Sequence, residues 1–132
     1  MRLTLTILVL FLFGCGRQTK DAQKAFEYWA GGPPPAGVVV LDGDYWKSPH
    51  FTYEYRVFLH LKAPHHWSWL NEFFALNEIV TTKSAYVLPN DAPNWFRPPS
   101  SGVVYRKVDP IESNFYVVDT ARGDVYIYEI QL

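Results

Sequence analysis

The stretch FTYEYRVFLHLK, residues 51–62, decides the fold. Its side chains alternate for twelve residues, so one set falls on each face of an extended chain. The first set is Phe51, Tyr53, Tyr55, Val57, Leu59 and Leu61, and the second is Thr52, Glu54, Arg56, Phe58, His60 and Lys62. This pattern predicts a strand of an antiparallel sheet, with the first face buried and the second largely solvated.

Helical spacing follows this strand and also occurs near the N-terminus. Pro64 suits the first position of a helix, where its missing N–H costs nothing, and Trp67, Leu70, Phe73, Phe74 and Asn77 then recur at steps of three and four. Ala22, Ala25, Phe26 and Trp29 have the same spacing within residues 21–29. A run of glycines and prolines, residues 31–35, ends that first helix. We expect the second helix to pack on the sheet and the first to be only loosely docked.

Further strands are predicted on both sides of this region, at residues 38–41, 79–80, 85–88, 103–108, 115–119 and 125–131. Asp42-Gly43-Asp44 predicts a turn that closes the first of them. Residues 89–102 contain four prolines and predict a long loop anchored by Trp95 and Phe96. The order of elements predicts an α+β fold, in which an antiparallel sheet of about five to six strands carries one helix across a face and follows a short N-terminal helix.

Composition narrows the classes of function. The 132 residues include 12 basic and 13 acidic side chains, so the net charge is −1 and lacks the basic excess that nucleic-acid binding requires. A single cysteine cannot form an internal disulfide, and the four histidines show no zinc-ligand spacing. We therefore predict no nucleic-acid partner, no metal and no cofactor.

The N-terminus carries the most specific motif. Positive charge at Arg2 precedes an apolar run that is too short for a spanning helix, which needs about 20 residues, and that suits a signal peptide. The run ends in Leu12-Phe13-Gly14-Cys15, which resembles the lipobox of bacterial lipoproteins. The resemblance implies cleavage before Cys15 and lipidation of its thiol and new amino group, so that several acyl chains hold the protein on a membrane. Gly16 stands where an inner-membrane retention signal has Asp, which implies export to the outer membrane, facing the periplasm.

These observations predict three segments. Residues 1–14 form the lipoprotein signal peptide. Residues 15–37 form a lipidated polar tether at 16–20, the short helix and a proline spacer. Residues 38–132 form a single α+β domain.

Catalytic patterns are weak, and the sequence favours a non-catalytic protein. The only cysteine is assigned to the anchor, and no serine lies in a glycine-flanked elbow. Glu72 and Glu78 are six residues apart and therefore fall on different faces of a helix.

The aromatic side chains suggest the binding surface. Too many occur for one buried face, and exposed tyrosine and tryptophan are enriched in interfaces. The hypothesis is a small envelope lipoprotein, of inhibitor, immunity or accessory type, that binds a protein partner through Tyr45, Trp46, Trp69, Trp95 and Phe96. The alternative is a cell-wall glycan binder or hydrolase that stacks sugars on the same rings, with polar contacts from Glu54, Glu72 or His60. A third reading, in which the proline loop or the first helix covers these aromatics, stays open.

Overall fold

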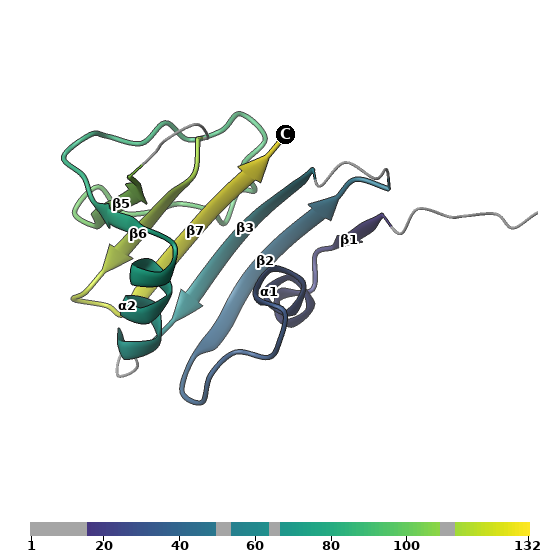
Figure 1. Ribbon diagram of the computed structural model, residues 1–132, viewed down its shortest axis with the longest axis horizontal. Helices are drawn as coiled ribbons and strands as arrows, with labels where there is room; N and C mark the ends of the chain where they lie inside the picture. The colour runs from purple at the N-terminus through teal and green to yellow at the C-terminus, as the bar shows by residue number, and fades with distance from the viewer. Residues whose placement is uncertain (1–15, 50–53, 64–66, 109–112) are drawn as a thin grey trace, which may run out of the picture.

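Over the residues that the structure describes, the fold is a seven-stranded antiparallel sheet with two helices (Figure 1). The computed structural model describes residues 16–49, 54–63, 67–108 and 113–132. The elements in chain order are β1 (Arg17–Thr19), α1 (Ala22–Ala30), β2 (Val39–Lys47), β3 (Tyr55–Lys62), α2 (Trp67–Leu76), β4 (Ile79–Thr81), β5 (Val103–Lys107), β6 (Phe115–Asp119) and β7 (Asp124–Gln131). The α+β class with an antiparallel sheet is confirmed. The strand order is β1-β2-β3-β7-β6-β5-β4. The sheet exceeds the predicted five to six strands because β1, at one edge, was not predicted as a strand, whereas β4, at the other edge, matches the short strand predicted at residues 79–80.

The predicted long strand forms β3, an inner strand next to the middle of the sheet, and its first residues, 51–53, lie outside the described residues. β3 pairs along its whole length with the last strand, β7, which is the middle strand of the seven, and the paired residues are more than 60 positions apart in sequence. One expectation was wrong. The second face of β3 is not largely solvated, because Phe58 on that face is fully buried.

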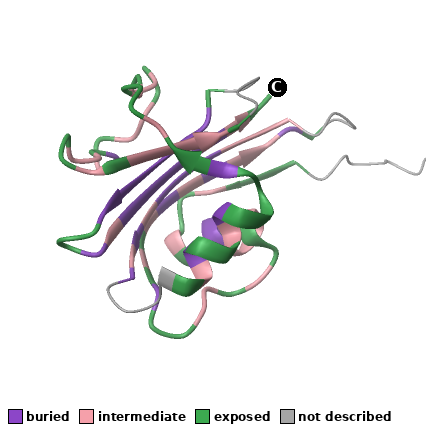
Figure 2. Cartoon of the chain, turned by 60° about the vertical axis from the view of Figure 1, so that its left-hand side comes forward, coloured by how far each residue is buried: buried purple, intermediate pink, exposed green. Residues whose placement is uncertain are grey.

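Both helices cover the same face of the sheet, as Figure 2 shows from the side. Ala25 and Phe26 from α1 and Leu70 and Phe74 from α2 belong to one buried cluster with the sheet residues. The sheet contributes Tyr45, Val57, Leu59, Leu61, Tyr116, Val118, Val125 and Ile127 to it. The packing of α2 on the sheet is confirmed. The expectation that α1 is only loosely docked is wrong, because its Ala25 and Phe26 are fully buried in this cluster.

The proline-rich loop covers the opposite face. Phe96 is fully buried there against Phe58 and Phe115 in a second cluster, with ring centroids 5.0 and 6.1 Å apart. Tyr86 from the same segment stacks on Phe115 at 4.6 Å, and its hydroxyl donates to the carbonyl of Pro98. Residues 85–88 were predicted as a strand, but they are irregular and belong to this covering loop.

The expected turn at Asp42-Gly43-Asp44 is wrong, since these residues lie inside the nine-residue strand β2. Gly43 is required there because α1 crosses directly over it. A Cβ atom at Gly43 would lie 2.7 Å from the Cβ atom of Ala25 and 3.2 Å from the backbone of Ala22. Glycine therefore marks a close helix–strand contact instead of a reversal of the chain.

The chain before α1 also joins the fold. Residues 16–20 were predicted as a tether, but Arg17–Thr19 pairs with the end of β2 as β1. Asp21 then caps α1, because its carboxylate accepts a hydrogen bond of 2.8 Å from the backbone N–H of Lys24. Gly31 ends the helix in the left-handed conformation, with φ of 78°.

Candidate functional site

The structure separates the five aromatic residues that were predicted to bind a partner. Tyr45 and Phe96 retain 6% and 0% of their exposure, so the prediction that they form a surface is wrong for both. Burial raises the pKa of the Tyr45 hydroxyl, against a smaller lowering by Arg17. These two rings belong to the two buried clusters on opposite faces of the sheet.

The three tryptophans of that set are half-buried and lie on both faces. Trp95 packs against the loop-side cluster, and Trp46 pairs with Arg56, whose guanidinium lies over the Phe58 ring on that same face. Trp69 packs on the helix side. The five residues therefore do not form one surface, and Trp69 is the member that lines the cleft between the helices and the sheet.

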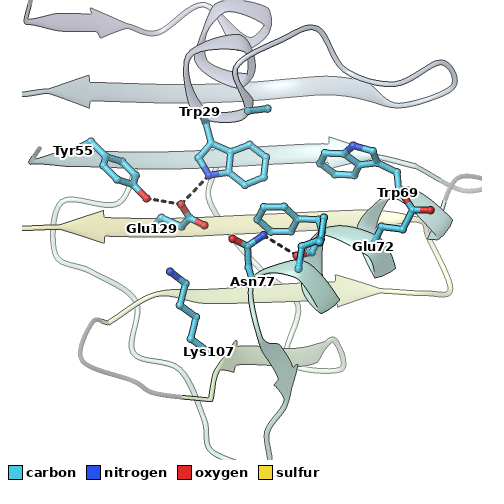
Figure 3. A pocket seen from close by; sticks show the side chains of 10 residues that line it. Trp29, Tyr55, Trp69, Glu72, Asn77, Lys107 and Glu129 are labelled. Atoms are coloured by element: carbon cyan, nitrogen blue, oxygen red, sulfur yellow. Dashed lines mark hydrogen bonds between the residues drawn. The ribbon is translucent and has the colours of Figure 1, made fainter.

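A cleft of about 400 Å³ opens between the two helices and the sheet (Figure 3). It lies where α2, the end of α1 and strands β3, β5 and β7 meet. Its lining residues are Trp29, Ala30, Tyr55, Trp69, Glu72, Phe73, Leu76, Asn77, Lys107 and Glu129. Ligand pockets commonly have volumes of about 300–1,000 Å³, so this cleft suits a single side chain or a small molecule.

Glu129 forms the polar floor of the cleft, and it is only 6% exposed. Its Oε2 atom accepts hydrogen bonds of 2.8 Å from the indole N–H of Trp29 and from the hydroxyl of Tyr55. Its Oε1 atom accepts a hydrogen bond from the hydroxyl of Tyr116. All three donors are neutral, so the carboxyl group is hydrogen-bonded without an ion pair among the residues that the structure describes.

The aromatic wall of the cleft is a set of rings in mutual contact. Trp29 meets Phe73 edge to face with centroids 5.0 Å apart, and Trp69 stacks parallel on Phe73 at 5.8 Å. Trp29 also contacts Trp69 at 6.4 Å. Contacts of this kind on all three rings hold the wall in one arrangement.

Two further charged side chains line the cleft. Glu72 is exposed on α2, and Lys107 extends from β5 toward the strand that carries Glu129 (Figure 3). Neither forms an ion pair with any part of the chain that the structure describes. The nearby Asn77 amide is engaged with the carbonyl of Phe73 at 2.8 Å.

The polar residues of the glycan alternative are also separated. Glu72 lines the cleft, whereas Glu54 does not. His60 lies on the loop side, stacked on Tyr126 at 4.3 Å, with ring nitrogens 3.1 Å from Asp124 and 3.5 Å from Asp42. Within the described ranges no group of three His, Cys, Asp or Glu side chains is placed to hold a metal ion.

Sequence reasoning missed Glu129, Lys107 and Tyr55 as site residues. The sequence did contain a pattern that points to Glu129, because it lies on the same face of the last strand as Val125 and Ile127. A carboxyl group in a row of core positions needs hydrogen-bond donors around it, and such a row marks a buried polar site.

No protein-family model, no curated protein and no solved structure matches the chain. Neither α1 nor α2, the helices of the described ranges, has the length and apolar character that crossing a membrane would need.

Proposed function

We propose that the protein is a non-catalytic, lipid-anchored binding protein of the bacterial cell envelope, which faces the periplasm from the outer membrane. Its role is that of an inhibitor, an immunity protein or an accessory subunit, and it binds a protein partner. The observation that supports this most is the cleft in which Trp29, Trp69 and Phe73 surround the floor formed by Glu129. Buried aromatic-lined hollows of this kind receive the anchor side chains of protein partners.

The chemistry of the cleft favours binding over catalysis. Its described lining residues include no serine, cysteine or histidine that would act as a nucleophile or a base near neutral pH. Glu129 already accepts three hydrogen bonds, which fix its position. A rigid, preorganised site of this kind suits recognition.

The lipid anchor is proposed on Cys15, and only a short segment of chain separates this residue from β1. Gly16 lies against Pro49, since a Cβ atom at Gly16 would be 3.0 Å from the Cβ atom of Pro49, and β1 begins at Arg17. Two residues span at most about 7 Å, so lipid on Cys15 would hold the β1 edge of the sheet close to the membrane. The test is uptake of labelled palmitate by the full chain. Labelling that persists in a Cys15→Ser variant would contradict the anchor.

Photocrosslinking tests the binding site. A crosslinking amino acid at Leu76, which lines the cleft and is 84% exposed, should capture a discrete partner in intact cells. The matched control is Val87, which is 82% exposed in the loop on the other face and should capture nothing of the same mass. Trp69→Ala should abolish the Leu76 product while the protein stays folded. A product that is unchanged by Trp69→Ala would overturn the proposed function.

A second candidate is glycan binding, favoured by one observation. Glu72 and Glu129 line the same aromatic cleft, and sugar sites combine ring stacking with carboxylates. Co-sedimentation with purified peptidoglycan separates the candidates: glycan binding predicts retention that Trp69→Ala removes, and protein binding predicts none.

A further inference from the structure

The charge arrangement of the cleft identifies the chemistry of its occupant. Glu129 and Glu72 place two carboxyl groups on the lining, against one ammonium group from Lys107. The Glu129 group is buried, and the three described side chains that donate hydrogen bonds to it are all neutral. Burying a carboxylate without a cation is costly, and no ion pair among the described residues involves Glu129, so a positively charged ligand would gain from this charge.

The hydrogen bonds leave room for one more donor at Glu129. A carboxylate offers about four acceptor sites on its two oxygens. Donors from the described residues use three of them, two on Oε2 and one on Oε1, and so leave one acceptor site on Oε1. A ligand N–H group that reaches the floor therefore finds an acceptor there.

The ring wall favours a flat cation. Trp29 and Trp69 line the cleft beside Glu129, and tryptophan is the aromatic side chain that attracts cations best. A guanidinium group is planar, stacks on indole rings and donates hydrogen bonds to carboxylates in a fixed geometry. An ammonium group is more strongly hydrated and does not stack in this way.

We propose that the cleft receives the guanidinium group of an arginine side chain presented by the protein partner, with Glu129 as its hydrogen-bond acceptor and the indole rings of Trp29 and Trp69 lining its place. This inference rests on the proposed function and specifies what the partner inserts. The volume of about 400 Å³ admits one extended arginine side chain and excludes a folded element.

The test uses two small probes on the full chain in a non-ionic detergent. N-acetyl-arginine methylamide is compared with N-acetyl-citrulline methylamide, which has the same shape and no charge. The readout is the indole N–H signal of Trp29 in ¹H–¹⁵N NMR spectra. The arginine probe should shift this signal saturably, and the citrulline probe should not. Absence of a saturable shift, or an equal response to both probes, would overturn the arginine assignment.

Two charge variants on the rim of the cleft should change the affinity for the arginine probe in opposite directions. Glu72→Gln should weaken binding of the arginine probe about two- to fivefold, and Lys107→Met should tighten it by about the same factor, because each removes one screened charge. Neither side chain makes an ion pair within the described residues, so both variants should fold. A neutral sugar would lose a hydrogen-bond donor in Lys107→Met and bind more weakly, which would contradict a cationic ligand.

The outcomes separate the two proposals. If the arginine probe fails but the Leu76 crosslink is still lost in Trp69→Ala, the partner uses another side chain and only the arginine assignment falls. If chitotriose shifts the Trp29 signal and the arginine probe does not, both the arginine assignment and the protein-partner function fall.

Discussion

The indole N–H of Trp29 donates a hydrogen bond of 2.8 Å to Glu129, which lies 100 residues later in the chain. The bond joins the last turn of α1 to the final strand, and Tyr55 from β3 and Tyr116 from β6 donate to the same carboxyl group. One acceptor therefore connects four elements. The cleft is complete only when α1 is docked, so its binding chemistry depends on tertiary structure.

This network predicts a large loss of stability when its acceptor is removed. Glu129→Leu leaves the part-buried donors of Trp29 and Tyr55 and the buried donor of Tyr116 without this acceptor, and we expect it to cost about 2–4 kcal/mol of unfolding free energy. Glu129→Gln keeps one carbonyl oxygen and should cost about 1–2 kcal/mol. Urea unfolding measures both. The control is Glu72→Gln on the exposed rim, which should change stability by less than about 0.5 kcal/mol. A Leu variant as stable as the wild type would show that the network contributes nothing to folding.

The contact of α1 with the sheet predicts a glycine requirement. Gly43→Ala places a methyl group 2.7 Å from the Cβ atom of Ala25 and 3.2 Å from the Ala22 backbone, where the helix cannot yield cheaply. We expect a loss of about 1–3 kcal/mol in thermal or urea unfolding. Gly32→Ala is the matched control, since nothing lies within 4 Å of its added methyl group. Equal stability of the two variants would contradict the close contact.

The fold class was predictable because alternation alone determines which strand positions can be buried together. Residues 51–62 alternate without interruption, and the part of them that the structure describes forms the inner strand β3. The order of the strands in the sheet could not be predicted from the sequence. β3 pairs with β7 through contacts more than 60 residues apart, and no local pattern reports that pairing.

The candidate site was predictable only in part, for a physical reason that Trp69 and Phe96 illustrate. Both are aromatic residues in segments with helix or loop signals, and the sequence cannot tell which one tertiary packing covers. The loop folds back over the second face of the sheet and buries Phe96, whereas Trp69 remains half-buried at the cleft. Gly43 misled for a related reason, because an Asp-Gly-Asp string marks a turn unless a helix packs on it.

Burial of Phe96 predicts that it is a stability residue and not a binding residue. Phe96→Ala should cost about 3–5 kcal/mol, because it opens a cavity between Phe58 and Phe115. Val87→Ala, in the same loop but 82% exposed, should be neutral in the same unfolding assay. If Phe96→Ala left stability unchanged, the loop would not be part of the second core.

The same core predicts a decline in stability at alkaline pH. Burial raises the pKa of the hydroxyls of Tyr86, Tyr126 and Tyr128, and the carboxylates of Asp124, Asp119 and Asp42 raise that of Tyr126 further, against a smaller lowering by Arg122. In the unfolded chain these groups ionise near the ordinary value of about 10. Above that pH the unfolded state binds fewer protons than the folded state, so the free energy of unfolding falls as pH rises through the folded pKa values.

The measurement is the urea midpoint from neutral pH to about pH 11, which should be flat below the ordinary tyrosine pKa and then fall. Tyr126→Phe should make the fall shallower, because it removes one of the raised groups and keeps the ring that stacks on His60 at 4.3 Å. Near-ultraviolet absorbance of the phenolate should show that these tyrosines ionise at a higher pH in the folded protein than in the urea-unfolded chain. A stability that rises above that pH, or a Tyr126→Phe profile identical to the wild type, would contradict the assignment of the alkaline loss to these buried hydroxyls.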